Sequence, residues 1–134
     1  MKLLDSNTII HYLKGNASVI ANFQAARPFE IAIPAIVLYE IEFGTLKSRV
    51  GASRKKMIAD LILNIEHVPF DADAARSAAR IRFELEARGI GMGPLDTLIA
   101  GIAVSRKAAL ITSNLQEFSR VDGLRLENWR ERYP

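Results

Sequence analysis

The chain has 134 residues, 49% hydrophobic and 25% charged, which is typical of one globular domain with a sizeable core. It contains no cysteine, which excludes disulfide scaffolds and thiolate zinc sites and fits a reducing cytoplasm. The net charge of +3 is a weak signal, and the longest apolar run, residues 31–39, is too short to span a membrane. The few residues before Asp5 are too short for a signal peptide, so we expect a cytoplasmic protein with no membrane partner.

The first half of the chain alternates short apolar segments, typical of buried strands, with segments of helical periodicity. We expect strands at residues 2–4 and 30–33, and helices at residues 6–14, 17–26, 34–46 and 53–65. Gly15 should stop the first helix. The fourth helix should turn Met57, Leu61 and Ile65 toward the core.

The second half continues the alternation. We expect strands at residues 108–112 and 124–126, a short strand or link at 67–70, and helices at 71–88, 94–107 and 114–120. The helix at 71–88 has the clearest apolar stripe, formed by Ala74, Ala78, Ile81 and Leu85. The alternation predicts an α/β fold, one domain over residues 1–134 with a short, mostly parallel central sheet flanked by helices.

Asp96 lies in the first turn of the helix that Pro94 opens. It shares a face with Ile99, Ala100 and Ala103, and a carboxylate among apolar residues needs compensation. One interpretation is that Asp96 only complements the helix dipole; the other is that it binds a cation. The small residues at Ala100, Gly101 and Ala103 allow this helix to pack closely against a neighbour.

Three further segments of the chain carry candidate site residues. Asp5 and Asn114 each follow a predicted strand, where the functional crevice of a parallel sheet lies. Each also has a structural explanation, because Asp5 can cap a helix and Asn114 with Glu117 matches a capping box. The helix after Pro34 adds Glu40 and Glu42, and helical spacing alone does not say which points inward.

Converging carboxylates repel one another, and a hard divalent cation relieves that repulsion. Oxygen ligands favour Mg²⁺ or Mn²⁺ over zinc, and such a site suits phosphodiester hydrolysis by a metal-activated water. Basic clusters, including Arg76, Arg80 and Arg82, could hold a polyanionic substrate, although each cluster alone is equally explained as a solvated helix face. No zinc motif or Ser-His-Asp arrangement can be built on His11 and His67.

Four motifs in this order resemble those of the PIN-domain ribonucleases, and most closely the VapC toxins of bacterial type II toxin–antitoxin modules. They are Leu3-Leu4-Asp5-Ser6-Asn7, Tyr39-Glu40-Ile41-Glu42-Phe43-Gly44, Gly93-Pro94-Leu95-Asp96-Thr97-Leu98-Ile99-Ala100 and Thr112-Ser113-Asn114-Leu115-Gln116-Glu117-Phe118. The likeness covers nearly the whole chain.

The resemblance implies that Asp5, Glu40 and Asp96 are the metal-binding acids, and it selects Glu40 over Glu42. Asn114 stands where the family often has an acid, so it would orient a water or a second ion without adding charge. Glu117 matches an acidic position at the rim of the site, and Arg80 and Arg82 lie on a helix that the likeness includes.

The resemblance also implies an endoribonuclease toxin that cleaves RNA, with tRNA as one candidate. A cognate antitoxin should restrain it, and the toxin should form a homodimer. The alternative hypothesis is a catalytically weak PIN-like binding module that acts with an antitoxin in transcriptional autoregulation. Asn114 is the residue that supports this alternative.

Overall fold

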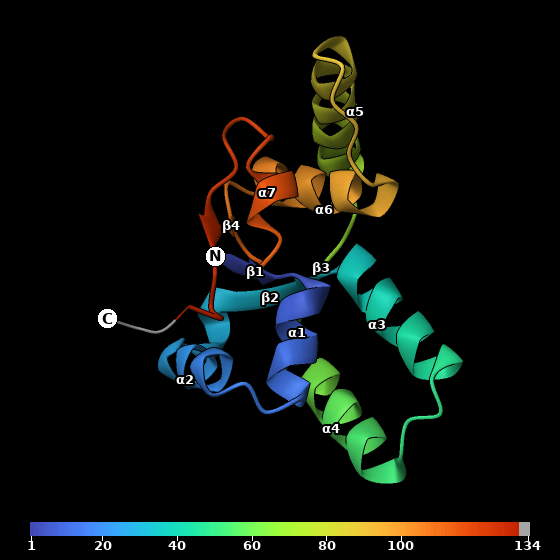
Figure 1. The fold of residues 1–134 in the computed structure, drawn as a ribbon, viewed down its shortest axis with the longest axis vertical. Helices are drawn as coiled ribbons and strands as arrows, with labels where there is room; N and C mark the ends of the chain where they lie inside the picture. The colour runs from blue at the N-terminus through green and yellow to red at the C-terminus, as the bar shows by residue number, and fades with distance from the viewer. Residues whose placement is uncertain (132–134) are drawn as a thin grey trace.

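The computed structural model describes residues 1–131, so the last three residues of the domain predicted over residues 1–134 lie outside the described part. Figure 1 shows a central sheet with helices on both of its sides. The strands are β1 (Lys2–Leu4), β2 (Ile31–Pro34), β3 (Glu66–Val68), β4 (Ala109–Ile111) and β5 (Leu126–Glu127). The α-helices are α1 (Ser6–Leu13), α2 (Ala17–Ala25), α3 (Ala35–Lys47), α4 (Ala52–Leu63), α5 (Ala72–Ala87), α6 (Pro94–Ser105) and α7 (Leu115–Phe118), and the turn Pro28–Glu30 is a 3₁₀ helix.

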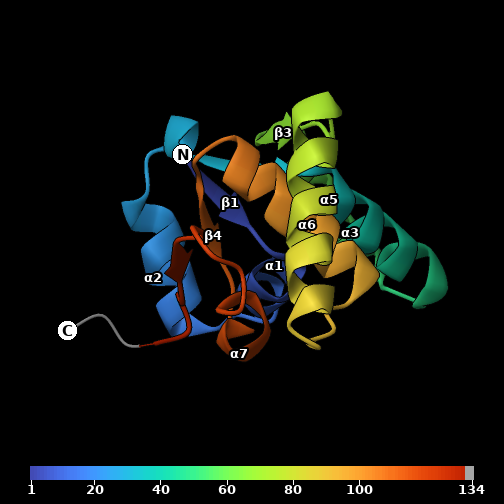
Figure 2. The same cartoon turned by 90° about the horizontal axis from the view of Figure 1, so that it is seen from above.

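The strands pair in the order β3-β2-β1-β4-β5, and every pairing within residues 1–131 is parallel. In Figure 1, α5 and α6 lie above the sheet, whereas α1, α2 and α4 lie below it. Figure 2, seen from above, shows α5 crossing α6. Helices on both faces explain why β2 and β4 are buried at every residue and read as unbroken apolar runs. The predicted parallel α/β fold is confirmed.

The apolar stripe predicted on α5 is confirmed, because Ala74, Ala78, Ile81 and Leu85 are all buried. This stripe faces α6, the helix with which α5 makes its most extensive contact. Gly101 on α6 allows the close approach. A Cβ added there would stand 2.6 Å from the Ala78 Cβ, much closer than real Cβ atoms come.

Two expectations about local structure were wrong. Of the three residues expected to face the core from the fourth helix, Leu61 and Ile65 do pack against it, but Met57 is 45% exposed and Ile58 is buried instead. Adjacent apolar residues at these two positions allow either face to be buried, and the packing of α4 beside α1 decides. The last strand begins at Leu126 and not at residue 124, because its register is set by pairing of Leu126 with Leu110 on β4.

No helix within residues 1–131 combines the length and the apolar character that crossing a membrane requires.

Candidate active site

Polar side chains gather where β1 and β4 end, at the point where the sheet changes its direction of winding. Strand β1 lies in the middle of the sheet, with β2 and then β3 on one side of it and β4 and then β5 on the other. Leu4 on β1 pairs with Ile111 on β4, so the next residues, Asp5 and Thr112, are neighbours. In open parallel sheets such a switch point is where ligands bind.

Asp5 is fixed in place by three hydrogen bonds. Its Oδ1 accepts from the Ser6 backbone N–H at 2.8 Å, and its Oδ2 accepts from the Thr112 hydroxyl at 2.7 Å and the Asn7 Nδ2 at 3.1 Å. The residue is only 3% exposed, and this burial raises the pKa of the Asp5 carboxyl above its usual value. Asp5 does cap α1, as one interpretation of the sequence held, but through Oδ1 alone.

Thr112 and Asn7 are the site residues whose roles sequence reasoning missed. Besides donating to Asp5, the buried Thr112 hydroxyl accepts from the Asn114 backbone N–H at 3.0 Å. Asn7 Oδ1 accepts from the Ser113 N–H at 3.1 Å and so ties α1 to the turn after β4. The available signal was position, because Thr112 follows an apolar strand just as Asp5 does.

Glu40 comes from α3, which follows β2 and therefore begins at the same edge of the sheet. Its Oε1 is buried and has no hydrogen-bond partner, whereas the neighbouring acid Glu42 is exposed. Burial raises the pKa of the Glu40 carboxyl, and the nearby charge of Asp5 raises it further. The structure thus turns Glu40, and not Glu42, toward Asp5.

Asp96 is the third residue of α6, and Pro94 is the first, as the sequence predicted. Because α6 leads back into parallel strand β4, its N-terminus lies at the same edge as the strand ends. The pKa of Asp96 is raised to about 7, first by burial and then by the charges of Asp5, Glu117 and Glu40. Four carboxylates are therefore close enough to influence one another's ionisation.

Asn114 does not form the capping box that the sequence allowed, since its side chain makes no cap hydrogen bond to α7. Its Nδ2 instead donates to Glu117 Oε2 at 3.0 Å. Glu117 Oε1 accepts from the Gly93 backbone N–H at 2.7 Å, and this hydrogen bond is the main reason that the pKa of Glu117 is lowered.

Arg80 and Arg82 lie outside this cluster, on the exposed side of α5. The Arg82 guanidinium pairs with Glu86 at 2.9 Å and lines a cavity of about 430 Å³ that Pro94 and Thr97 of α6 also line. Arg82 is therefore adjacent to the helix that carries Asp96, whereas Arg80 has no such link to the site.

The donor chemistry of the site suits a hard divalent cation. All the groups that converge offer oxygen, and the buried Glu40 Oε1 is a polar atom without a partner, which is costly unless something binds it. Within residues 1–131 no three Asp, Glu or His side chains are arranged as a ready metal-binding group. Like charges repel, which favours separation of the carboxylates when no cation lies between them.

Asp96→Ala is expected to leave the protein as stable as the parent, or up to about 1 kcal/mol more stable, in EDTA at pH 8. The folded-state pKa of about 7 exceeds the ordinary 3.8, so between these values the folded chain holds a proton that the unfolded chain lacks. Stability should therefore fall as pH rises through this window, and less steeply in the variant. Urea unfolding from pH 4 to 8 measures this, with exposed Asp60→Ala as control. A large loss of stability would support the dipole role of Asp96 alone.

Comparisons with known proteins show which family this chain is similar to. The PIN domain family model matches residues 2–124. The chain is 34% identical over 127 residues to the tRNA(fMet)-specific endonuclease VapC of Salmonella typhimurium, covering 95% of this chain and 96% of that protein. It is 33% identical to Ribonuclease VapC2 of Rickettsia felis, with the same coverage.

A solved structure is similar over almost its whole length. It is VapBC2 from Rickettsia felis bound to a DNA fragment from their promoter, with a TM-score of 0.88 and 31% identity over 96% of this chain and 98% of that chain. The chain therefore belongs to the PIN-domain family, among its VapC ribonuclease toxins.

Proposed function

We propose that the endoribonuclease activity of this toxin depends on Mg²⁺ or Mn²⁺ held by Asp5, Glu40 and Asp96, with Asn114 beside them. The observation that carries this proposal is the convergence of three partly or fully buried carboxylates at the switch point of the sheet, one of them with an unpartnered oxygen. The alternative, a catalytically weak binding module, is not favoured, since the curated relatives are named ribonucleases.

Each site residue has a distinct task in this proposal. When bound, the cation would activate a water and stabilise the charge that develops on the scissile phosphate. Asp5 is already held by hydrogen bonds from Thr112, Asn7 and the Ser6 N–H. Its side chain would therefore lose little further freedom when a cation binds. Asn114 donates its Nδ2 to Glu117, which turns its amide oxygen away from that residue and adds no negative charge.

RNA cleavage by the purified chain tests the metal site. With Mg²⁺ or Mn²⁺ we expect cleavage that EDTA abolishes and that Asp96→Asn and Glu40→Gln each lower by about a hundredfold or more, because each removes a charged ligand. Glu42→Gln is the matched control on the same helix, with an exposed acid, and should retain activity. Cleavage that persists unchanged in EDTA and in Asp96→Asn would overturn the mechanism.

The substrate is RNA in this proposal, and tRNA is the first candidate because one relative is named for tRNA(fMet). Arg82, on the cavity beside α6, would bind a phosphate near the site, and Arg80 would extend the contact along α5. Glu117 would act at the rim of the site through its bond to Asn114. Comparing cleavage of tRNA, unstructured RNA and DNA separates these substrates.

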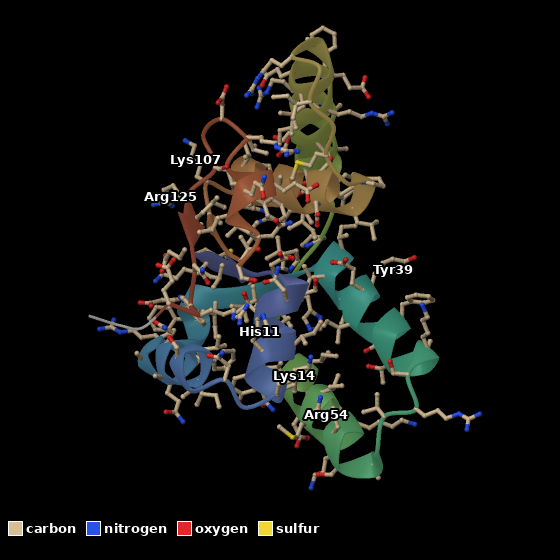
Figure 3. The ribbon with its side chains drawn as sticks, viewed as in Figure 1. His11, Lys14, Tyr39, Arg54, Lys107 and Arg125 are labelled. Carbon is tan, nitrogen blue, oxygen red and sulfur yellow. The ribbon has the colours of Figure 1, made fainter. Side chains whose placement is uncertain are left out.

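The proposed antitoxin would bind a groove next to the site. The groove between α1, α3 and α4 has a cavity of about 230 Å³ and reaches from Glu40 to Arg54, with an apolar lining of Ile10, Leu13, Ile41, Val50 and Ile58. Arg54, labelled on α4 in Figure 3, donates its Nη2 to the Leu13 carbonyl of α1 at 3.4 Å. An apolar segment lying there would end at the acids of the site and block them.

We further propose that the protein is cytoplasmic, that its domain extends over residues 1–134, and that it forms a homodimer.

The homodimer is supported by an exposed apolar surface on α5. Phe83 is 74% exposed and borders a hollow that Phe70 and Leu98 also line, which suits a protein contact. Phe83→Ser is expected to lower the mass measured by light scattering from dimer to monomer without unfolding the chain. A monomeric parent protein would refute the dimer.

A further inference from the structure

The N-terminus of α6 is capped by a residue from a different helix. Gly93 precedes the helix and has no side chain to cap it. Asp96 is the third helical residue, the position from which an acid commonly reaches back to the backbone N–H of the residue before the helix. Here that N–H donates instead to Glu117 Oε1, at 2.7 Å, from α7.

Both carboxylates stand close to Gly93. A Cβ added to Gly93 would lie 3.4 Å from Asp96 Oδ2 and 3.5 Å from Glu117 Oε1, so the two acids approach the same short segment. The single Gly93 N–H can donate a well-aligned hydrogen bond to only one of the two carboxylates. Glu117 has the advantage because its other oxygen is held by Asn114 Nδ2 at 3.0 Å, which fixes the side chain at both ends.

We propose that Glu117 is a positioning residue that takes the capping place of Asp96 at α6 and so leaves the Asp96 carboxylate available to the site. This inference rests on the proposed metal-dependent function. It assigns Glu117 no direct contact with substrate or cation. Without Glu117, Asp96 would turn back to the Gly93 N–H and be withdrawn from Asp5 and Glu40.

Amide hydrogen exchange at Gly93, followed by NMR in EDTA, tests the capping directly. The parent and Asp96→Ala should both exchange slowly, because Glu117 holds the N–H in each. Exchange at Gly93 should also remain slow in Glu117→Ala, because Asp96 then accepts from the N–H. In the double variant Asp96→Ala/Glu117→Ala, exchange should be at least about tenfold faster than in either single variant. Fast exchange in Asp96→Ala, or equal rates in Glu117→Ala and the double variant, would overturn the proposal.

Metal affinity supplies the second readout. Glu117→Ala should weaken Mn²⁺ binding, measured by calorimetry, by about tenfold or more. Glu117→Gln keeps an oxygen that accepts from Gly93 and should recover most of that affinity. A Gln variant as damaging as the Ala variant would overturn the capping role, because the negative charge itself would then be needed. Gln116→Ala, exposed on the same short helix, is the matched control.

The two experiments distinguish this inference from the proposed function. Exchange at Gly93 needs neither metal nor RNA, so its outcome stands even if the chain proves not to bind Mn²⁺. Should Glu117→Ala fail to fold, Asp96→Ala still decides which acid holds the Gly93 N–H, because it removes one acceptor and keeps the other. Slow exchange in that variant assigns the N–H to Glu117, and fast exchange overturns the proposal.

Discussion

Gly101→Ala should lower the free energy of unfolding by about 2 kcal/mol or more, although alanine favours helices more than glycine does. The added methyl group would stand 2.6 Å from the Ala78 Cβ and 2.8 Å from the Ala74 carbonyl oxygen. The second contact is with backbone, so α5 and α6 must move apart along their shared face. Urea unfolding followed by circular dichroism measures the loss.

Gly44→Ala is the matched control, because Gly44 also lies within a helix, α3, and a Cβ there would meet nothing within 4 Å. It should raise the free energy of unfolding by about 0.5–1 kcal/mol through helix propensity alone. Opposite signs for the two substitutions would assign the loss at Gly101 to packing. A gain at both positions would show that α5 and α6 are less closely packed than described.

The Gly101 variant should also affect the site, since α6 carries Asp96 at its first turn and Gly101 in its middle. Moving α6 away from α5 would displace Asp96 relative to Asp5, which is fixed to the sheet. We therefore expect weaker RNA cleavage by Gly101→Ala even at temperatures where the variant remains folded.

Ile81→Arg is expected to prevent folding altogether. Ile81 is 5% exposed within the stripe of α5 that faces α6, so the substitution places an unpaired charge in the core. The expected cost of several kcal/mol is comparable with the whole stability of a domain of this size. Expression in the soluble fraction and thermal melting test this.

The control for Ile81→Arg is Glu84→Arg, an exposed position on the same helix. It introduces the same side chain without burial and should change stability by no more than about 0.5 kcal/mol. Normal melting of the Ile81 variant would refute the assignment of this stripe to the core.

Much of the fold could be predicted from the sequence because its signals are local. Gly89 follows α5 with a φ of +70°, a conformation that glycine favours at a helix end, and Pro94 opens α6 as the sequence predicted. Where two faces of a helix are almost equally apolar, as at Met57 and Ile58, the local pattern contains no answer. Contact with α1 then decides which side chain is buried.

The candidate site could also be predicted only in part. Its acids could be identified from the sequence, because a carboxylate at a buried strand end or on an apolar helix face is costly unless its charge is compensated. The choice of Glu40 over Glu42 came only from resemblance, and the burial of Glu40 Oε1 now supplies a physical basis for it. Its role as a metal ligand remains a prediction.

The alternation of strands and helices, the parallel sheet and the candidate acids all follow from local patterns in the sequence. The hydrogen bonds that hold the acids in place depend on the folded arrangement, because they join residues far apart in the chain. Thr112 reaches Asp5 through the register of β4 against β1, and Glu117 reaches Gly93 through the placement of α7 beside α6. A hydrogen bond needs atoms within about 3 Å, and the sequence pattern does not specify that distance across the fold.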